Sequence, residues 1–236
     1  MDQLEQSLYG VQERRELEPL HKYTAKTFAW MFLGLMVTFA VSLFGYATGS
    51  IRYVFMVPYA PLILLLAELG VVIFLTSRIE RMSVGMARGM FFTYAALTGI
   101  VFSVYFLIYD LTSLVMAFAS ASLYFGVMAL VGYTTKIDLS RIRNVLMTGL
   151  IILIVFEVLS KFVLQLAQFE RVMCLLGIAV FLGYTAYDTQ KIKVYHAAFG
   201  ADPEMAKKAS IFSALQLYLD FINLFLYILR YMGKKK

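Results

Sequence analysis

A stripe of polar side chains runs through one of the most apolar stretches of the sequence, SALQLYLDFINLFLYILRYMGKKK at residues 213–236. Its members are Ser213, Gln216, Asp220, Asn223 and Tyr227, at successive spacings of three, four, three and four residues. At about 100° per residue in an α-helix, all five fall within an arc of roughly 80°. A membrane helix turns such a stripe toward protein or water and away from lipid. The pattern therefore predicts a central helix whose polar face lines an interior path.

Asp220 is the member of this stripe that is hardest to explain as packing. Ser, Gln, Asn and Tyr side chains often join membrane helices by hydrogen bonds, and a purely structural seam is the alternative interpretation of the stripe. An aspartate fits that alternative poorly, because asparagine forms similar hydrogen bonds at a smaller desolvation cost. We therefore expect a functional role for Asp220, and we regard the other stripe residues as candidates for lining a pore.

A second carboxylate, Asp188, closes the preceding apolar run in the stretch GYTAYDTQKIK. Tyr184, Thr185 and Thr189 share its helix face, so hydroxyl groups accompany the carboxylate on that face. This grouping favours a functional role at or just inside the membrane boundary. The alternative is a solvated aspartate at a helix end, beside the basic Lys191.

Two antiparallel neighbouring helices would bring Asp188 and Asp220 together. Carboxylates held about 4 Å apart repel each other by about 4 kcal/mol at an effective dielectric constant of 20. Such a pair shares one proton near neutral pH and titrates as a unit. The protonated pair would form a hydrogen-bonded latch between two helices. The ionised pair would repel itself and attract a cation, for which Ca²⁺ is preferred as a weakly bound or permeant metal ion.

Other charged residues near the membrane are candidates for a pore or latch. Glu68 lies in the middle of PLILLLAELGVVIF, where a role facing the bundle and a passive role both remain open. Arg78 and Arg81 follow the same apolar run. Basic residues at helix ends usually extend toward the membrane surface, but one of these two arginines could instead pair with Asp188.

The elements that must position these residues are membrane helices. Hydrophobic residues make up 61% of the 236-residue chain and charged residues 15%, whereas soluble domains carry about 25% charged residues. Seven runs are near the length of about 20 residues that a bilayer requires. They lie at residues 28–48, 57–76, 89–109, 112–133, 145–164, 172–188 and 209–231. We therefore predict an all-α integral membrane protein, a seven-helix bundle in contact with lipid.

The chain divides into a tail at 1–27, a transmembrane domain at 28–231 and a basic tail at 232–236. Basic residues concentrate on one side of the alternating connections, which predicts a cytoplasmic amino terminus. That side carries Arg14, Arg15, Lys22, Lys26, Arg78, Arg81, Arg88, Lys136, Arg141, Arg143, Lys191, Lys193, Lys207 and Lys208, against Arg52, Lys161 and Arg171 on the other. The basic end of the last segment opposes this rule, so that segment either crosses, which we favour, or re-enters and returns.

Several classes of function are excluded or disfavoured by composition. The single cysteine, Cys174, allows no internal disulfide, and the only histidines, His21 and His196, lie in polar stretches. The basic residues follow the membrane topology, and nothing resembles a nucleic-acid-binding motif. We expect neither an enzyme nor a bound cofactor.

The carboxy-terminal fifth of the chain resembles the Bax inhibitor family, also called transmembrane Bax inhibitor motif proteins. The resemblance rests on YDTQKI at 187–192 followed by ALQLYLDFINLFLYILR at 214–230. It implies six helices around a central seventh, a pH-sensitive calcium leak, and a two-aspartate sensor at Asp188 and Asp220. It also implies an arginine near the end of the second helix that pairs with the first aspartate, here Arg78 or, less favourably, Arg81. Similar bacterial members are plasma-membrane proteins, and some associate with a membrane protease.

A pH-sensitive calcium leak channel is thus the favoured function. A proton-coupled transporter and a non-conducting regulator that binds a membrane protease are the alternatives. An intramembrane aspartyl protease is least favoured, since such enzymes carry Gly-x-Gly-Asp and Pro-Ala-Leu motifs. This chain has YLD around Asp220 and no Pro-Ala-Leu.

Overall fold

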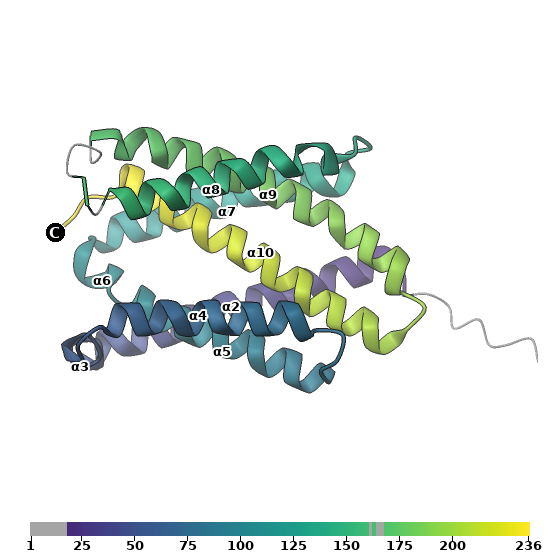
Figure 1. Ribbon diagram of the computed structural model, residues 1–236, viewed down its shortest axis with the longest axis horizontal. Coiled ribbons are helices and arrows are strands. Elements are labelled where there is room, and N and C mark those ends of the chain that lie inside the picture. Colours follow the sequence, from purple (N-terminus) through teal and green to yellow (C-terminus); the bar gives the residue numbers. More distant parts are fainter. Residues whose placement is uncertain (1–17, 161, 164–167) are drawn as a thin grey trace, which may run out of the picture.

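The computed structural model describes residues 18–160, 162–163 and 168–236, and within these ranges it contains helices and no β-strand. Figure 1 shows them packed lengthwise in one bundle. In chain order they are α2 (Leu20–Ala47), α3 (Ser50–Met56), α4 (Ala60–Arg78), α5 (Val84–Phe102), α6 (Tyr105–Ile108), α7 (Leu111–Thr134), the 3₁₀ helix η1 (Leu139–Ile142), α8 (Arg143–Leu159), α9 (Glu170–Phe199) and α10 (Pro203–Met232).

Seven helical segments among the described residues are long and apolar enough to cross a membrane. They are α2, α4, α5 together with α6, α7, η1 together with α8, α9 and α10. This confirms the predicted all-α, seven-helix architecture. Of the charges used to predict the orientation, Arg14, Arg15 and Lys161 lie outside the described residues, as does the tail at 1–17.

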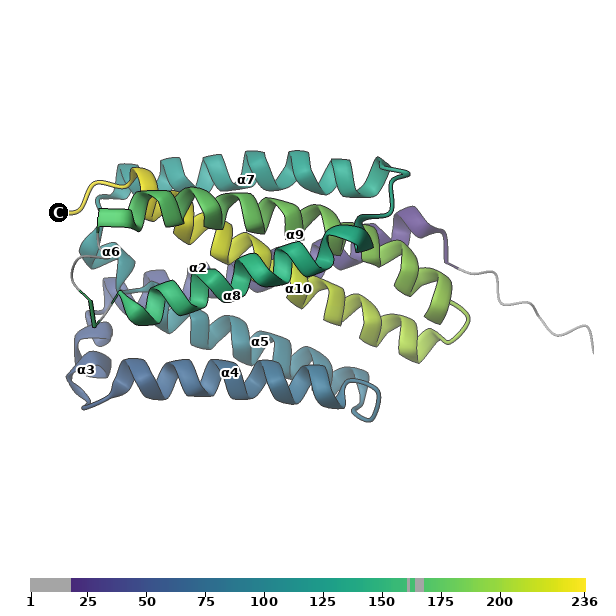
Figure 2. The same ribbon diagram turned by 45° about the horizontal axis from the view of Figure 1, so that its top comes forward.

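The last segment is a single uninterrupted helix of 30 residues. At about 1.5 Å per residue it is long enough to cross a bilayer, and a helix that re-enters and returns would need a break that α10 lacks. The carboxy terminus consequently lies at the opposite end of the bundle from the start of α2 (Figures 1 and 2).

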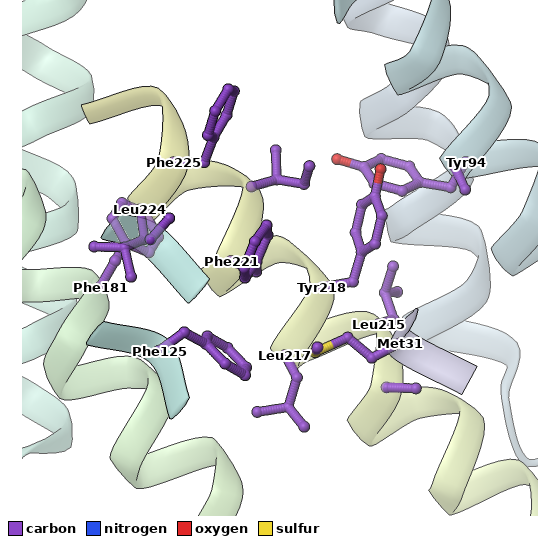
Figure 3. Packing of buried hydrophobic residues seen from close by; sticks show 14 of the residues in the cluster. Met31, Tyr94, Phe125, Phe181, Leu215, Leu217, Tyr218, Phe221, Leu224 and Phe225 are labelled. Carbon is purple, nitrogen blue, oxygen red and sulfur yellow. The ribbon is translucent and has the colours of Figure 1, made fainter. Parts of the chain in front are cut away.

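α10 is the central helix of the bundle, as expected. In its most apolar stretch 67% of the residues are buried, against 44% in α9 and at most 33% in each of the other spans. It packs against α9, α2, α7 and α5. Figure 3 shows Tyr218 beside Tyr94 on one side of α10 and Phe221 beside Phe125 on the other, with ring centroids 5.8 and 5.5 Å apart.

The surrounding helices turn large apolar side chains outward. Phe32 on α2, Leu66 on α4, Leu123 on α7 and Ile154 on α8 each expose more than half of their surface. A soluble protein rarely exposes apolar surface on this scale. The outer face of the bundle is therefore suited to contact with lipid.

α7 and α9 approach each other closely at Gly132. A Cβ atom at this position would collide with the carbonyl oxygen of Ala186 in α9. Because only glycine lacks a Cβ, the two backbones can touch here. By contrast, a Cβ atom at Gly126 on the same helix would meet open space.

Polar contacts inside the bundle also fix the central helix. The hydroxyl of Tyr218 lies 2.6 Å from that of Thr38 on α2. Thr38 in turn donates a hydrogen bond to the carbonyl oxygen of Ala95 on α5 at 2.8 Å. These contacts join α2, α5 and α10 at one level of the core.

α7 begins at a well-formed helix cap. The Asp110 carboxylate accepts a hydrogen bond from the Ser113 amide at 2.6 Å. That bond holds the pKa of Asp110 below its usual value.

Candidate functional site

Asp188 and Asp220 both lie in the interior of the bundle. Asp220 is 4% exposed near the middle of α10, and Asp188 is 6% exposed on α9. Asp188 stands well within α9, because this helix continues to Phe199, beyond the predicted end of the sixth span at 188. The alternative of a solvated aspartate at a helix end is therefore wrong.

The pairing of α9 with α10 brings the two aspartates to the same level. The two helices run antiparallel (Figure 1). Residue numbers therefore rise along α9 in the direction in which they fall along α10. The ring of Phe181 stacks on that of Tyr227 at 5.8 Å between centroids. Asp188 and Asp220 each lie seven residues, or about two helical turns, from this pair. The two carboxylates therefore lie at the same level of the contact between α9 and α10, where like charges repel each other.

Lys191 supplies the cation at this pair of carboxylates. Its ammonium lies 3.2 Å from Oδ1 of Asp188 and donates a hydrogen bond to Oε1 of Gln216 at 3.2 Å. Gln216 lies one helical turn from Asp220, so the ammonium is held near the level of both carboxylates. The sequence signal for this role is the spacing of three residues between Asp188 and Lys191, which places both on one helix face.

The two carboxylates are incompletely satisfied. Apart from the ion pair to Lys191, neither Oδ1 of Asp188 nor Oδ2 of Asp220 has a hydrogen-bond partner within the described residues. The buried hydroxyls of Thr189 and Ser213 also lack a partner there. Unpaired buried oxygens of this kind are costly, and they are available to a proton, a water molecule or a cation.

The remaining residues of the stripe have distinct surroundings. Gln216 is engaged by Lys191, whereas the side chain of Asn223 donates to the carbonyl oxygen of Leu219 on its own helix at 2.8 Å. Tyr227 lies beneath the guanidinium of Arg230, 4.5 Å from the ring centroid. The stripe therefore includes both helix-joining groups and groups that satisfy themselves locally.

A cavity of about 180 Å³ opens beside Tyr227 at the end of the bundle that carries the carboxy terminus. Its lining includes Glu157, Glu170 and Arg230. Arg230 donates a hydrogen bond to Oε2 of Glu157 at 2.8 Å. This contact between helices was not predicted, since sequence spacing alone offers Glu157 only neighbours on its own helix. The cavity presents two carboxylates against one guanidinium, so its net charge is negative.

Arg78 and Glu68 lie apart from the two aspartates. Arg78 is exposed at the end of α4 and, like Arg81, forms no ion pair among the described residues. α4 packs against α5 and α3, on the opposite side of the bundle from α9 (Figure 2). Pairing of Arg78 with Asp188 is therefore absent from this structure. Glu68 instead lies near Thr98 and Tyr94 of α5.

This arrangement is suited to weak and reversible binding of a cation. Calcium takes six to eight oxygen ligands in a tight protein site. No group of three or more His, Cys, Asp or Glu residues that could hold a metal occurs in the described part of the chain. Two carboxylates can bind Ca²⁺ weakly, but they offer too few oxygens for a closed cage.

Residues 20–236 match a protein family described as "Inhibitor of apoptosis-promoting Bax1". The chain is 37% identical over 238 residues to the inner membrane protein YbhL of Escherichia coli strain K12, and the alignment covers 100% of both chains. It is 36% identical over 219 residues to the protein RP147 of Rickettsia prowazekii, covering 93% of this chain and 92% of that one. A Borreliella burgdorferi protein is 31% identical over 229 residues, covering 95% and 97%. These similarities extend over all seven long helices.

Proposed function

Because the chain belongs to the Bax inhibitor-1 family, we propose that it is a pH-sensitive calcium leak channel of the bacterial inner membrane. Its relative YbhL is named as an inner membrane protein, which supports the membrane assignment. In this proposal Asp188 and Asp220 form the proton sensor that couples α9 to α10. The amino terminus is cytoplasmic, on the side where basic residues concentrate.

The observation that supports the proposal is the burial of two carboxylates at the same level of the contact between the central helix and its neighbour. Both are at most 6% exposed. Oδ2 of Asp220 has no hydrogen-bond partner in the described residues, and Oδ1 of Asp188 has only the ion pair to Lys191. A purely structural seam would not require two ionisable groups at the same level of the bundle, because neutral amides form the same hydrogen bonds at lower cost.

Protonation controls the spacing of the two helices. With a shared proton, Asp188 and Asp220 form a hydrogen bond that holds α9 against α10. When the proton leaves, the carboxylates repel each other and attract a cation. Calcium flux therefore rises as the pH increases through the titration of the pair, while Lys191 competes with the incoming ion for Asp188.

The route to the sensor follows the polar stripe. The acidic cavity beside Tyr227 supports an entrance for cations from the end that carries the carboxy terminus. Tyr227, Asn223, Asp220, Gln216 and Ser213 then follow one another along α10 toward the other end. Movement of α10 away from α9 would expose this stripe.

The test is calcium flux into liposomes that contain the purified protein, reported by an enclosed dye across pH 5 to 8. We expect a pH-dependent flux in the wild type, and a lower flux with a flat pH response in Asp188→Asn and Asp220→Asn. The matched control is Asp138→Asn, since Asp138 is an exposed cap residue and asparagine caps helices as well as aspartate does.

The alternatives give distinct results in the same assay. Flux no greater than that of empty vesicles at every pH would reject the channel and leave a non-conducting regulator, such as one that binds a membrane protease. Calcium uptake against its own gradient, driven by an imposed pH gradient, would identify a proton-coupled transporter. An unchanged pH response in Asp220→Asn would reduce Asp220 to a packing residue.

A further inference from the structure

We propose that a cleft at the basic end of the bundle binds the headgroup of an anionic phospholipid. The cleft lies between α2, α5 and the start of α10 and has a volume of about 560 Å³. The lining residues that carry the inference are Glu18, Lys26, Trp30, Leu33, Arg88 and Lys207. The inference is independent of whether the protein conducts calcium.

The charges in this cleft favour an anion. Three cations line it against a single carboxylate, and Lys26 already pairs with that carboxylate, Glu18. Arg88 and Lys207 are exposed, and neither forms an ion pair with any part of the chain that the structure describes. Arginine and lysine are the residues that most often bind phosphate groups. Two of the cations are thus available to a phosphate.

The walls of the cleft are held in place by contacts between α2 and α10. Tyr23 donates a hydrogen bond to the carbonyl oxygen of Ala206 at 3.2 Å. The hydroxyls of Thr27 and Ser210 lie 2.9 Å apart. These bonds fix α2 beside the start of α10, so the cleft is formed before any ligand arrives.

The order of side chains along α2 favours a lipid over a free anion. Lys26, Trp30 and Leu33 follow one another on one helix face, at spacings of four and three residues. Charge, aromatic ring and apolar side chain therefore succeed one another in the direction of the membrane interior. The same order occurs in a phospholipid, from phosphate to acyl chain. Tryptophan is also enriched at the membrane interface.

The aromatic ring joins the charged and apolar parts of the cleft. The guanidinium of Arg88 lies 4.9 Å from the centroid of the Trp30 ring, which rests against Phe92 at 6.0 Å. Leu33, next along the face, is 46% exposed. The cleft is therefore open toward the lipid-facing surface of α2. Basic clefts of this kind between membrane helices recognise acidic headgroups in the cytoplasmic leaflet.

Trp30 is the only tryptophan in the chain, so its fluorescence reports on this cleft alone. The full-length protein is placed in lipid nanodiscs that contain a small, fixed fraction of either brominated phosphatidylglycerol or brominated phosphatidylcholine. Bromine quenches tryptophan at close range. We expect phosphatidylglycerol to quench Trp30 more strongly than phosphatidylcholine does.

Substitution of a lining cation tests whether the cleft causes this preference. Lys207→Gln is the main variant, because Arg88 touches the reporter ring itself. Each basic residue near a membrane surface contributes about 1 kcal/mol to binding of anionic lipid, or about fivefold in affinity. We therefore expect Lys207→Gln to reduce the preference for phosphatidylglycerol about fivefold. Lys136→Gln removes a basic residue that does not line the cleft and should leave the preference unchanged.

Three outcomes would overturn the inference. The first is equal quenching of the wild type by both lipids. The second is an equal loss of preference in Lys136→Gln and Lys207→Gln, which would reflect the general surface charge. The third is full relief of the quenching by millimolar inorganic phosphate or glycerol phosphate, which would identify a site for free anions.

Discussion

Replacement of Lys191 by glutamine removes the cation that pairs with Asp188, the only such partner of this carboxylate in the described part of the chain. The ammonium lies 3.2 Å from Oδ1 of Asp188, and its side chain is 22% exposed. Lys191 favours the ionised state of the pair, so its loss favours the state that retains a proton. We therefore expect the pH midpoint of calcium flux in Lys191→Gln to move upward.

The size of this shift follows from the geometry of the ion pair. Opposite unit charges 3.2 Å apart attract each other by about 5 kcal/mol at an effective dielectric constant of 20. One pH unit corresponds to about 1.4 kcal/mol, so the upper bound is about four pH units. Because Lys191 is partly exposed and water screens its charge, we expect a shift of at least about one unit.

The assay is dye-reported calcium flux in liposomes, measured at closely spaced pH values for wild type, Lys191→Gln and Lys191→Arg. Lys193→Gln is the matched control, since it removes the same charge from the same helix. The Lys193 ammonium lies over the ring of Tyr133, 5.3 Å from the centroid, and within the described residues it forms no ion pair with either aspartate. Lys191→Arg should keep a midpoint close to that of the wild type.

Equal midpoints in Lys191→Gln and Lys193→Gln would refute this reasoning, because the contact with Asp188 would then have no influence on proton binding. A downward shift in Lys191→Gln would refute it as well. Thermal unfolding of each variant in detergent, measured in parallel, separates a change in the sensor from a loss of fold.

Three further predictions concern the helices that hold the site. Gly132→Ala forces α7 away from α9 and should lower the free energy of unfolding in detergent by about 1–3 kcal/mol. The control Gly126→Ala should be neutral or stabilising. Equal effects of the two substitutions would contradict the close contact. Tyr218→Phe removes the hydroxyl bonded to Thr38 and should cost about 1 kcal/mol; an unchanged melting temperature would show that this bond contributes nothing. Since the folded-state pKa of Asp110 is lowered, its cap stabilises the protein fully above the usual aspartate pKa of about 3.9 and is lost as the pH falls through the folded-state value. Asp110→Asn should retain the cap at low pH, and identical acid unfolding curves would argue against this.

Helical periodicity is sufficient to predict which face of α10 carries the polar groups. The stripe from Ser213 to Tyr227 does face another helix, since Gln216 contacts Lys191 on α9. It is not the most deeply buried face of α10, because Gln216 and Asn223 are half-buried whereas Leu217 is fully buried. The same argument predicts the central position of α10. Hydrophobic length likewise predicts the seven spans.

Sequence patterns do not predict the contacts between helices that are far apart in the chain. The pairing of Arg230 with Glu157 depends on the rotation of α8 relative to α10, which short connections do not specify. The end of α9 was misjudged for a different reason: hydropathy detects only the apolar part of a helix, whereas α9 continues through the polar stretch after Asp188. The cleft around Trp30 combines three segments far apart in the chain, and no local pattern indicates it.

The direct contact between the backbones of α7 and α9 at Gly132 determines which part of the bundle is free to move. Ala186, which touches Gly132, lies two residues from Asp188, so α9 is braced against α7 at nearly the level of the paired carboxylates. If α9 slid along α7, larger side chains next to Gly132 and Ala186 would collide with the backbone of the opposite helix. The two helices therefore move as one rigid unit. Any increase in the distance between Asp188 and Asp220 has to come from displacement of α10.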